Sequence, residues 1–149
     1  MEGKAIVHGA VTIINAISTG KGGAVGIALK TEAAVELLKD SKDIEVEIIG
    51  GKKEDPTLAK ESVRSVLNYF SISKMGAHVR IKSEIPIARG LKSSSTAANS
   101  IVLATLSALD KKIPDEDAVK LGVEAAFKAK VTITGAYDDA CASYFGGIV

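Results

Sequence analysis

The stretch Ile85-Pro86-Ile87-Ala88-Arg89-Gly90-Leu91-Lys92-Ser93-Ser94-Ser95-Thr96 places a proline, a glycine and a run of hydroxyl side chains directly before a long apolar segment. Helix N-termini expose unpaired backbone N–H groups and carry partial positive charge, so they attract phosphate. Small residues let a polyphosphate approach the backbone, and hydroxyls can donate to phosphate oxygens or coordinate Mg²⁺. Capping a helix needs only a single hydroxyl, and capping is the simpler alternative for this run. Because four hydroxyl residues follow one another from Ser93, we predict a nucleotide phosphate loop.

The composition predicts one soluble globular domain. The chain has 149 residues, of which 46% are hydrophobic, enough for a core. Its 19 Lys and Arg residues nearly balance 18 Asp and Glu residues, and only 4% of residues are aromatic. No basic stripe stands out, so we expect no nucleic-acid partner. Cys141 has no second cysteine to pair with, which fits a reducing cytosol. A small buried residue is a simpler interpretation of this cysteine than a nucleophile. No apolar run approaches a membrane span, and we expect a cytoplasmic protein without a membrane partner.

Hydrophobic periodicity predicts strands in the first half of the chain and mostly helices in the second. Alternating or β-branched runs predict strands over 4–8, 11–18, 44–49 and 77–85. The first two are separate strands or a hairpin, because Gly9 divides them. The segment 27–38 has helix-forming composition but alternates, and its place between strands favours a strand. Helical spacing predicts helices over 56–70, 94–109, 114–128 and 140–145.

The remaining segments are expected to be loops and turns. A glycine-dense loop covers 19–26 and a turn covers 50–55. Residues 146–149 resemble the opening of a strand, and the chain stops within it, which favours the N-terminal portion of a longer protein.

Other site motifs are weak or absent. The Walker pattern Gly-x4-Gly-Lys-Ser/Thr does not occur. Gly20, Gly22 and Gly26 resemble a dinucleotide fingerprint, but no clean βαβ unit follows them. His8 and His78 lack Cys or His companions at ligand spacing, which disfavours a zinc site.

Three ordered motifs resemble the GHMP small-molecule kinases, a superfamily that phosphorylates alcohols with ATP. The pattern Pro86-x3-Gly90-Leu91-x-Ser93-Ser94-Ser95 is similar to the second signature motif of that superfamily. Gly3-Lys4-Ala5, with Gly9 and the strand through Asn15, resembles its N-terminal substrate motif. The segment 134–140, followed by two glycines at 146–147, resembles its catalytic-aspartate segment. The resemblance implies an α+β fold, the ribosomal protein S5 domain 2-like mixed sheet packed with helices. Residues 1–149 would be the GHMP kinase N-terminal ATP-binding domain.

Longer strings, among them 9–22 and 142–147, are similar to the archaeal-type shikimate kinases within that superfamily. This finer resemblance implies transfer of the γ-phosphoryl group of ATP to the 3-hydroxyl of shikimate, with Mg²⁺ as the metal. It also implies that the C-terminal half of the same enzyme is a partner of this domain. Two alternatives stay open. One is another GHMP kinase that acts on homoserine or mevalonate, and the other is a non-catalytic binding module, because the same topology occurs in ribosomal proteins.

The resemblance also assigns nucleotide contacts residue by residue. Backbone N–H groups of the loop would hold the phosphates, and Ser94 and Ser95 would contact the β- and γ-phosphates, with Ser94 as the metal ligand. A lysine at position 92 departs from the small residue usual there, and it either adds charge to the phosphate site or points to solvent. The full set of expected cofactor-binding residues is Pro86, Ile87, Ala88, Arg89, Gly90, Leu91, Lys92, Ser93, Ser94, Ser95 and Thr96.

The expected catalytic residues are Asp139 and Lys4. Counted back from the glycine pair at 146–147, Asp139 falls on the position of the superfamily's catalytic aspartate, which would accept or orient the proton of the attacking hydroxyl. Lys4 matches the lysine that sits beside that aspartate, where an ammonium favours the charged carboxylate. Asn15, Thr19 and Asp138 are the expected substrate contacts. Without the resemblance, the two aspartates would equally well charge a helix N-terminus, and Lys4 would be an ordinary solvated lysine.

Overall fold

A mixed sheet and a layer of helices make up the computed structural model, which describes residues 1–15, 17, 19–50, 55–87, 89–132 and 137–149. Over these residues the chain order is β1 (Glu2–Ile14), β2 (Gly23–Leu38), β3 (Ile44–Ile48), α1 (Thr57–Tyr69), β4 (Gly76–Ser83), α2 (Ser93–Ala108), α3 (Asp115–Lys128) and α4 (Tyr137–Phe145). The strand order in the sheet is β1-β2-β4-β3. The pairs β1/β2 and β2/β4 are antiparallel, whereas β3 and β4 run parallel because α1 crosses between them.

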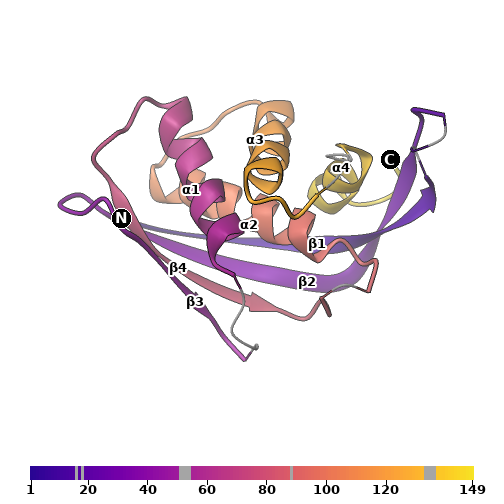
Figure 1. Cartoon of the computed structure of the whole chain (residues 1–149), viewed down its shortest axis with the longest axis horizontal. Helices are drawn as coiled ribbons and strands as arrows, with labels where there is room; N and C mark the ends of the chain where they lie inside the picture. Colours follow the sequence, from indigo (N-terminus) through magenta and orange to yellow (C-terminus); the bar gives the residue numbers. More distant parts are fainter. Residues whose placement is uncertain (16, 18, 51–54, 88, 133–136) are drawn as a thin grey trace.

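The helices cover one face of the sheet and leave the other face open (Figure 1). Alternation along the strands explains the division, since successive side chains point to opposite faces. Val35 of β2 lies opposite Val79 of β4 in the register, and both are fully buried with Val63 of α1 and Ile101 of α2. Helix α2 also packs on α1 and α3 through Val102. It is therefore buried on most of its sides, which its largely apolar sequence permits.

The prediction of two separate strands or a hairpin over 4–8 and 11–18 is wrong, because residues 4–8 and 11–14 belong to the single strand β1, which ends at Ile14. Gly9 lies at a register shift between His8 and Ala10 in the β1–β2 pairing. The glycine therefore marks an irregularity in one strand, as a β-bulge does, and not a turn between two strands. Residues 16 and 18 lie outside the described residues.

The other predicted elements are confirmed with changes at their ends, and the glycine-dense loop expected over 19–26 is shorter, because residues 23–26 form the start of β2. The segment 27–38 lies within β2, so the alternating pattern decided its state over its helix-forming composition. The helix predicted at 140–145 begins earlier, at Tyr137, so that Asp138 and Asp139 lie in the first turn of α4. Residues 146–149 meet β2 through a bridge between Val25 and Ile148. Of the turn expected at 50–55, residues 51–54 lie outside the described residues. Among the helices that the structure describes, none has the length and apolar character needed to cross a membrane.

The close approach of β1 to α2 requires a glycine at position 3. A Cβ atom there would stand 2.2 Å from the backbone oxygen of Ala104 and 2.2 Å from the backbone nitrogen of Ala108. These are backbone atoms that cannot rotate away, so any side chain would push the strand and the helix apart.

We expect Gly3→Ala to lower the free energy of unfolding by about 2 kcal/mol, the usual cost of overpacking a tight contact. The measurement is the midpoint of urea unfolding, with Gly23→Ala as the control. At Gly23 the nearest atom to an added Cβ is 3.4 Å away, an ordinary contact. Equal destabilisation by the two substitutions would contradict the account of the β1–α2 contact.

Candidate functional site

The loop before α2 turns sharply into the helix through two residues with left-handed backbone. Gly90 has φ 73° and Lys92, the residue immediately before the helix, has φ 59°. Glycine adopts this conformation freely, whereas for lysine it costs roughly 1 kcal/mol or more. The Lys92 carbonyl is fixed from inside the helix, because it accepts hydrogen bonds from the Thr96 N–H at 3.0 Å and from the Thr96 hydroxyl at 2.8 Å.

The N-terminus of α2 presents unused donors. No side chain caps the helix, and Thr96 has the first N–H that bonds back along the chain. The backbone N–H groups and hydroxyls of Ser93, Ser94 and Ser95 have no hydrogen-bond partner within the described ranges, and all three residues are partly exposed. An added Cβ at Gly90 would meet nothing within 4 Å, so the loop is open to a ligand there. We call Gly90 and Ser93–Ser95 the anion cradle.

A buried carboxylate lies beside this helix end. Asp139, in the first turn of α4, is only 7% exposed. Its Oδ2 lies 2.8 Å from the Lys92 Nζ, and its Oδ1 accepts a hydrogen bond of 3.1 Å from the hydroxyl of Thr12 on β1. Strand β1, the start of α2 and the start of α4 therefore converge on one charged pair. The arrangement places a buried carboxylate beside an uncapped helix N-terminus.

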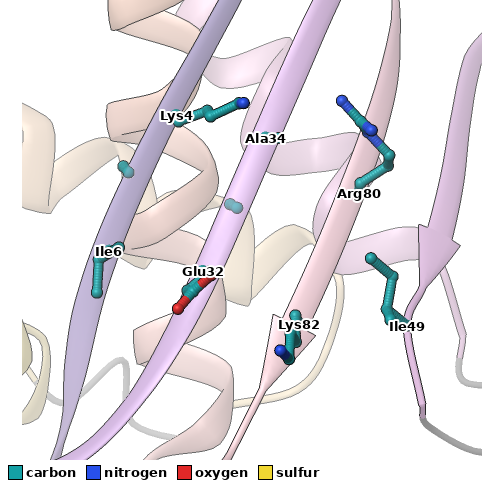
Figure 2. A pocket seen from close by; sticks show the side chains of 9 residues that line it. Lys4, Ile6, Glu32, Ala34, Ile49, Arg80 and Lys82 are labelled. Atoms are coloured by element: carbon teal, nitrogen blue, oxygen red, sulfur yellow. The ribbon is translucent and has the colours of Figure 1, made fainter.

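Lys4 does not take part in this site, and the expected Lys4–Asp139 pair is wrong. Gly3 faces α2, so the next residue of β1 points to the open face of the sheet. Thr12, which contacts Asp139, lies eight residues further along β1, about 26 Å at the usual rise of a strand. Figure 2 shows Lys4 and Arg80 pointing toward each other across β2 on this face. The Lys4 Nζ lies 3.7 Å from the Glu2 carboxylate.

Lys92 stands where Lys4 was expected. From the sequence alone we expected this lysine to add charge to a phosphate site or to point to solvent, and its pairing with Asp139 was not expected. The one indication of a special role for Lys92 was that it replaces the small residue usual at that position. Thr12 gave no signal, because a threonine in a β-branched strand is ordinary.

The predicted substrate residues lie in different places. Asp138 is half-buried beside Asp139, in the same turn of α4. Asn15 and Thr19 are exposed, and their side chains are used in local turns, with Asn15 Oδ1 accepting from the N–H of Ile17 and Thr19 Oγ1 from the N–H of Lys21. The structure does not bring these two residues into contact with Asp139.

The predicted phosphate residues divide in the same way. Thr96 is fully buried and its hydroxyl bonds within the helix, so it faces no ligand. Pro86, Ile87, Arg89 and Gly90 are exposed, and Leu91 is partly exposed. Ala88 and residues 133–136 of the aspartate segment lie outside the described residues. Among the residues described, no cluster of three or more His, Cys, Asp or Glu side chains could hold a metal ion.

Cys141 is buried on α4, as expected of a structural residue. Burial raises the pKa of its thiol, which keeps it protonated and poorly nucleophilic near neutral pH.

Comparison with known proteins identifies the family. The family model described as GHMP kinases N terminal domain matches residues 57–147. The chain belongs to the GHMP kinase family. The solved structure of the mevalonate kinase of Methanococcus jannaschii has the same fold as this GHMP domain, with a TM-score of 0.83, 18% identity, and coverage of 99% of this chain and 52% of that chain. The α+β architecture inferred from the sequence is therefore confirmed.

Curated relatives are more similar in sequence than the solved structure. A shikimate kinase of Methanococcoides burtonii is 55% identical over 147 residues, which cover 99% of this GHMP chain and 51% of the relative. A shikimate kinase of Pyrococcus abyssi is 48% identical over 148 residues, with coverage of 99% and 54%. The chain thus spans about half the length of these curated relatives.

The Lys92–Asp139 pair is expected to stabilise the GHMP domain. In a double-mutant cycle with Lys92→Met and Asp139→Asn, we expect a coupling free energy of about 1–3 kcal/mol, because both groups are largely shielded from water. The measurement is the free energy of unfolding in urea. The control cycle uses Glu116 and Lys120, an exposed pair on α3 at 3.5 Å, with an expected coupling of at most about 0.5 kcal/mol. Equal couplings in the two cycles would contradict the structure of the site.

Proposed function

We propose that the protein containing this domain transfers the γ-phosphoryl group of ATP to an alcohol, and that the alcohol is shikimate. The observation that carries the reaction type is the position of Asp139, held by Lys92 and Thr12 beside an uncapped helix N-terminus. The acceptor is supported by the curated relatives of 48–55% identity, which are named shikimate kinases. The family supports a small-molecule kinase in either case.

Asp139 would act on the acceptor and not on the nucleotide. In the proposed step the 3-hydroxyl oxygen of shikimate forms a bond to the γ-phosphorus of ATP, and the bond from that phosphorus to the β,γ-bridging oxygen breaks to give ADP. The acceptor proton passes to an oxygen of Asp139. Lys92 balances the charge of this carboxylate at 2.8 Å, and Thr12 fixes its other oxygen. Both contacts orient the carboxylate before the acceptor arrives.

The anion cradle would hold the transferred phosphoryl group. Unpaired N–H groups and hydroxyls of Ser93–Ser95 can donate to phosphate oxygens as charge builds up on them. Helix α2 has 16 residues and its dipole favours an anion at this end. The loop is open at Gly90, which allows close approach of a triphosphate.

The hydroxyl of Ser94 is the proposed metal ligand of the domain. A partly exposed serine without a competing partner fits Mg²⁺, which usually keeps several waters and binds through substrate phosphates with few protein ligands. When bound, Mg²⁺ would neutralise charge on the phosphate oxygens.

We further propose that the chain is the N-terminal half of the enzyme. Its curated relatives are about twice as long, since it covers 51% and 54% of two of them. A second half would close the side of the site that this chain leaves open and would supply further contacts to shikimate and ATP. The proposed location is the cytoplasm, where ATP is available.

The direct test is acceptor-dependent release of ADP by the whole protein, with shikimate, mevalonate and homoserine as parallel acceptors. We expect release with shikimate alone. Release with mevalonate or homoserine instead would support the reaction type and overturn the assignment of shikimate as the acceptor. Binding of ATP without transfer to any acceptor would overturn the kinase proposal.

Asp139→Asn is expected to lower kcat for phosphoryl transfer by roughly 10²–10⁴-fold, because the proton acceptor is lost while the shape of the side chain is kept. The KM for ATP should change by less than about threefold, since the anion cradle is intact. Asp138→Asn should instead raise the KM for shikimate with little loss of kcat. Steady-state kinetics measure both variants, with Glu116→Gln, an exposed acid on α3, as the control. Full activity of Asp139→Asn would contradict the assignment.

Ser94→Ala is expected to weaken binding of Mg·ATP by about tenfold, the loss of roughly one hydrogen bond to a charged group. Ser107→Ala is the matched control, because it makes the same change at an exposed position near the C-terminal end of α2. The readout is the rise in melting temperature that saturating Mg·ATP produces in the whole protein. An equal rise in melting temperature in wild type and Ser94→Ala would show that Ser94 does not bind Mg·ATP.

A further inference from the structure

An asparagine is buried in the middle of the apolar helix α2. Asn99 is 1% exposed, and its Nδ2 donates two hydrogen bonds to α4, at 3.0 Å to the carbonyl of Ala140 and at 2.8 Å to the hydroxyl of Ser143. Ala140 follows Asp139 directly in the chain. Asn99 therefore joins the helix that begins with the anion cradle to the helix turn that carries the carboxylate.

The oxygen of the same amide, Asn99 Oδ1, has no partner among the described residues. Asn99 Oδ1 is fully buried and accepts no hydrogen bond from the part of the chain that is described. Turning the amide over would place Oδ1 against the carbonyl oxygen of Ala140, and two acceptors facing each other repel, so the amide keeps this orientation. A buried polar atom without a partner is unfavourable, and such atoms are rare in native proteins.

A glycine on α3 makes room for that oxygen. A Cβ atom at Gly122 would stand 2.6 Å from Asn99 Oδ1. Glycine within a helix is itself unfavourable for helix formation, and Gly122 lies inside α3. Asn99 and Gly122 are each unfavourable where they stand, and both are needed for the same contact. We call the two hydrogen bonds from Asn99 to α4 the clamp.

Stability alone does not account for the pair. A leucine at position 99 would have nearly the shape of asparagine and would bury no polar atom, so packing by itself favours leucine. What leucine cannot do is hold the backbone of α4 at a fixed distance from α2 by donating to the Ala140 carbonyl. The clamp fixes the first turn of α4, and that turn carries Asp139.

We propose that Asn99 is a positioning residue that holds Asp139 in register with the anion cradle, and that Gly122 is required because it accommodates Asn99. The inference rests on the proposed phosphoryl transfer and adds the element that sets its geometry. A displacement of the carboxylate by a fraction of an ångström slows transfer without weakening the hold of the cradle on ATP.

The test uses Asn99→Leu and Gly122→Ala in the whole protein. Asn99→Leu should leave the melting temperature equal or higher, lower kcat by 10–100-fold and change the KM for ATP by less than threefold. Gly122→Ala should lower kcat in the same way in wild type, yet have no further effect on kcat in an Asn99→Ala background, because it acts through Asn99. If Asn99 only stabilised the fold, kcat would not fall while the KM for ATP stayed constant. The effects of Gly122→Ala and Asn99→Ala on kcat would then also be additive.

Thr105→Val is the matched control. It replaces another buried polar side chain of α2 by an apolar isostere, but the Thr105 hydroxyl bonds only to Ile101 within the helix. We expect kcat within twofold of wild type. Unchanged kcat in Asn99→Leu, or full additivity of Gly122→Ala with Asn99→Ala, would overturn the proposal.

Hydrogen exchange of the α4 amides separates this proposal from the proposed function. Asn99→Leu should speed exchange at Asp139–Ser143 by at least tenfold and leave α1 unchanged. If wild type phosphorylates no acceptor, the proposed function fails, and exchange still decides whether Asn99 fixes α4. Unchanged exchange in α4 would overturn the clamp whatever the activity.

Discussion

Helix α2 is packed on most of its sides, and the rest of the site depends on where that packing leaves its N-terminus. The backbone of the helix comes against β1 at Gly3, and its apolar side chains fill the space between the sheet, α1 and α3. A helix so enclosed cannot slide or rotate without opening the core. Its first turn is consequently fixed at one end of the molecule, near α4 and the C-terminal residues (Figure 1).

The partial positive charge at the uncapped N-terminus of α2 is offset by the negative charge of the Asp139 carboxylate beside it. The dipole of α2 and the Lys92 ammonium are both positive and both lie near Asp139, while the acidic first turn of α4 suits the N-terminus of that second helix. Lys92 has an unfavourable backbone conformation, and the buried Asn99 Oδ1 has no partner among the described residues. Local departures of this kind are expected where a site, and not the fold, determines the residue.

The sequence predicted the scaffold better than it predicted the contacts of the site. Periodicity and Pro56 located α1, and alternation located β2 against its helix-forming composition, because both signals depend on which face is buried. The direction of Lys4 depends on Gly3 facing α2, and the partner of Lys92 depends on the packing of α4. Such contacts join residues far apart in the chain, and neither spacing nor resemblance to a family contains their register. Asn99 gave no signal for the same reason, since a single polar residue in an apolar run points to no partner.

The most direct measurement is a crystal structure of the whole protein with a non-hydrolysable ATP analogue, Mg²⁺ and shikimate. We predict that the γ-phosphate lies against the N–H groups of Ser93–Ser95 and that the 3-hydroxyl of shikimate lies within about 3.2 Å of a carboxylate oxygen of Asp139. Phosphates bound away from the start of α2, or an acceptor hydroxyl that does not reach Asp139, would contradict it.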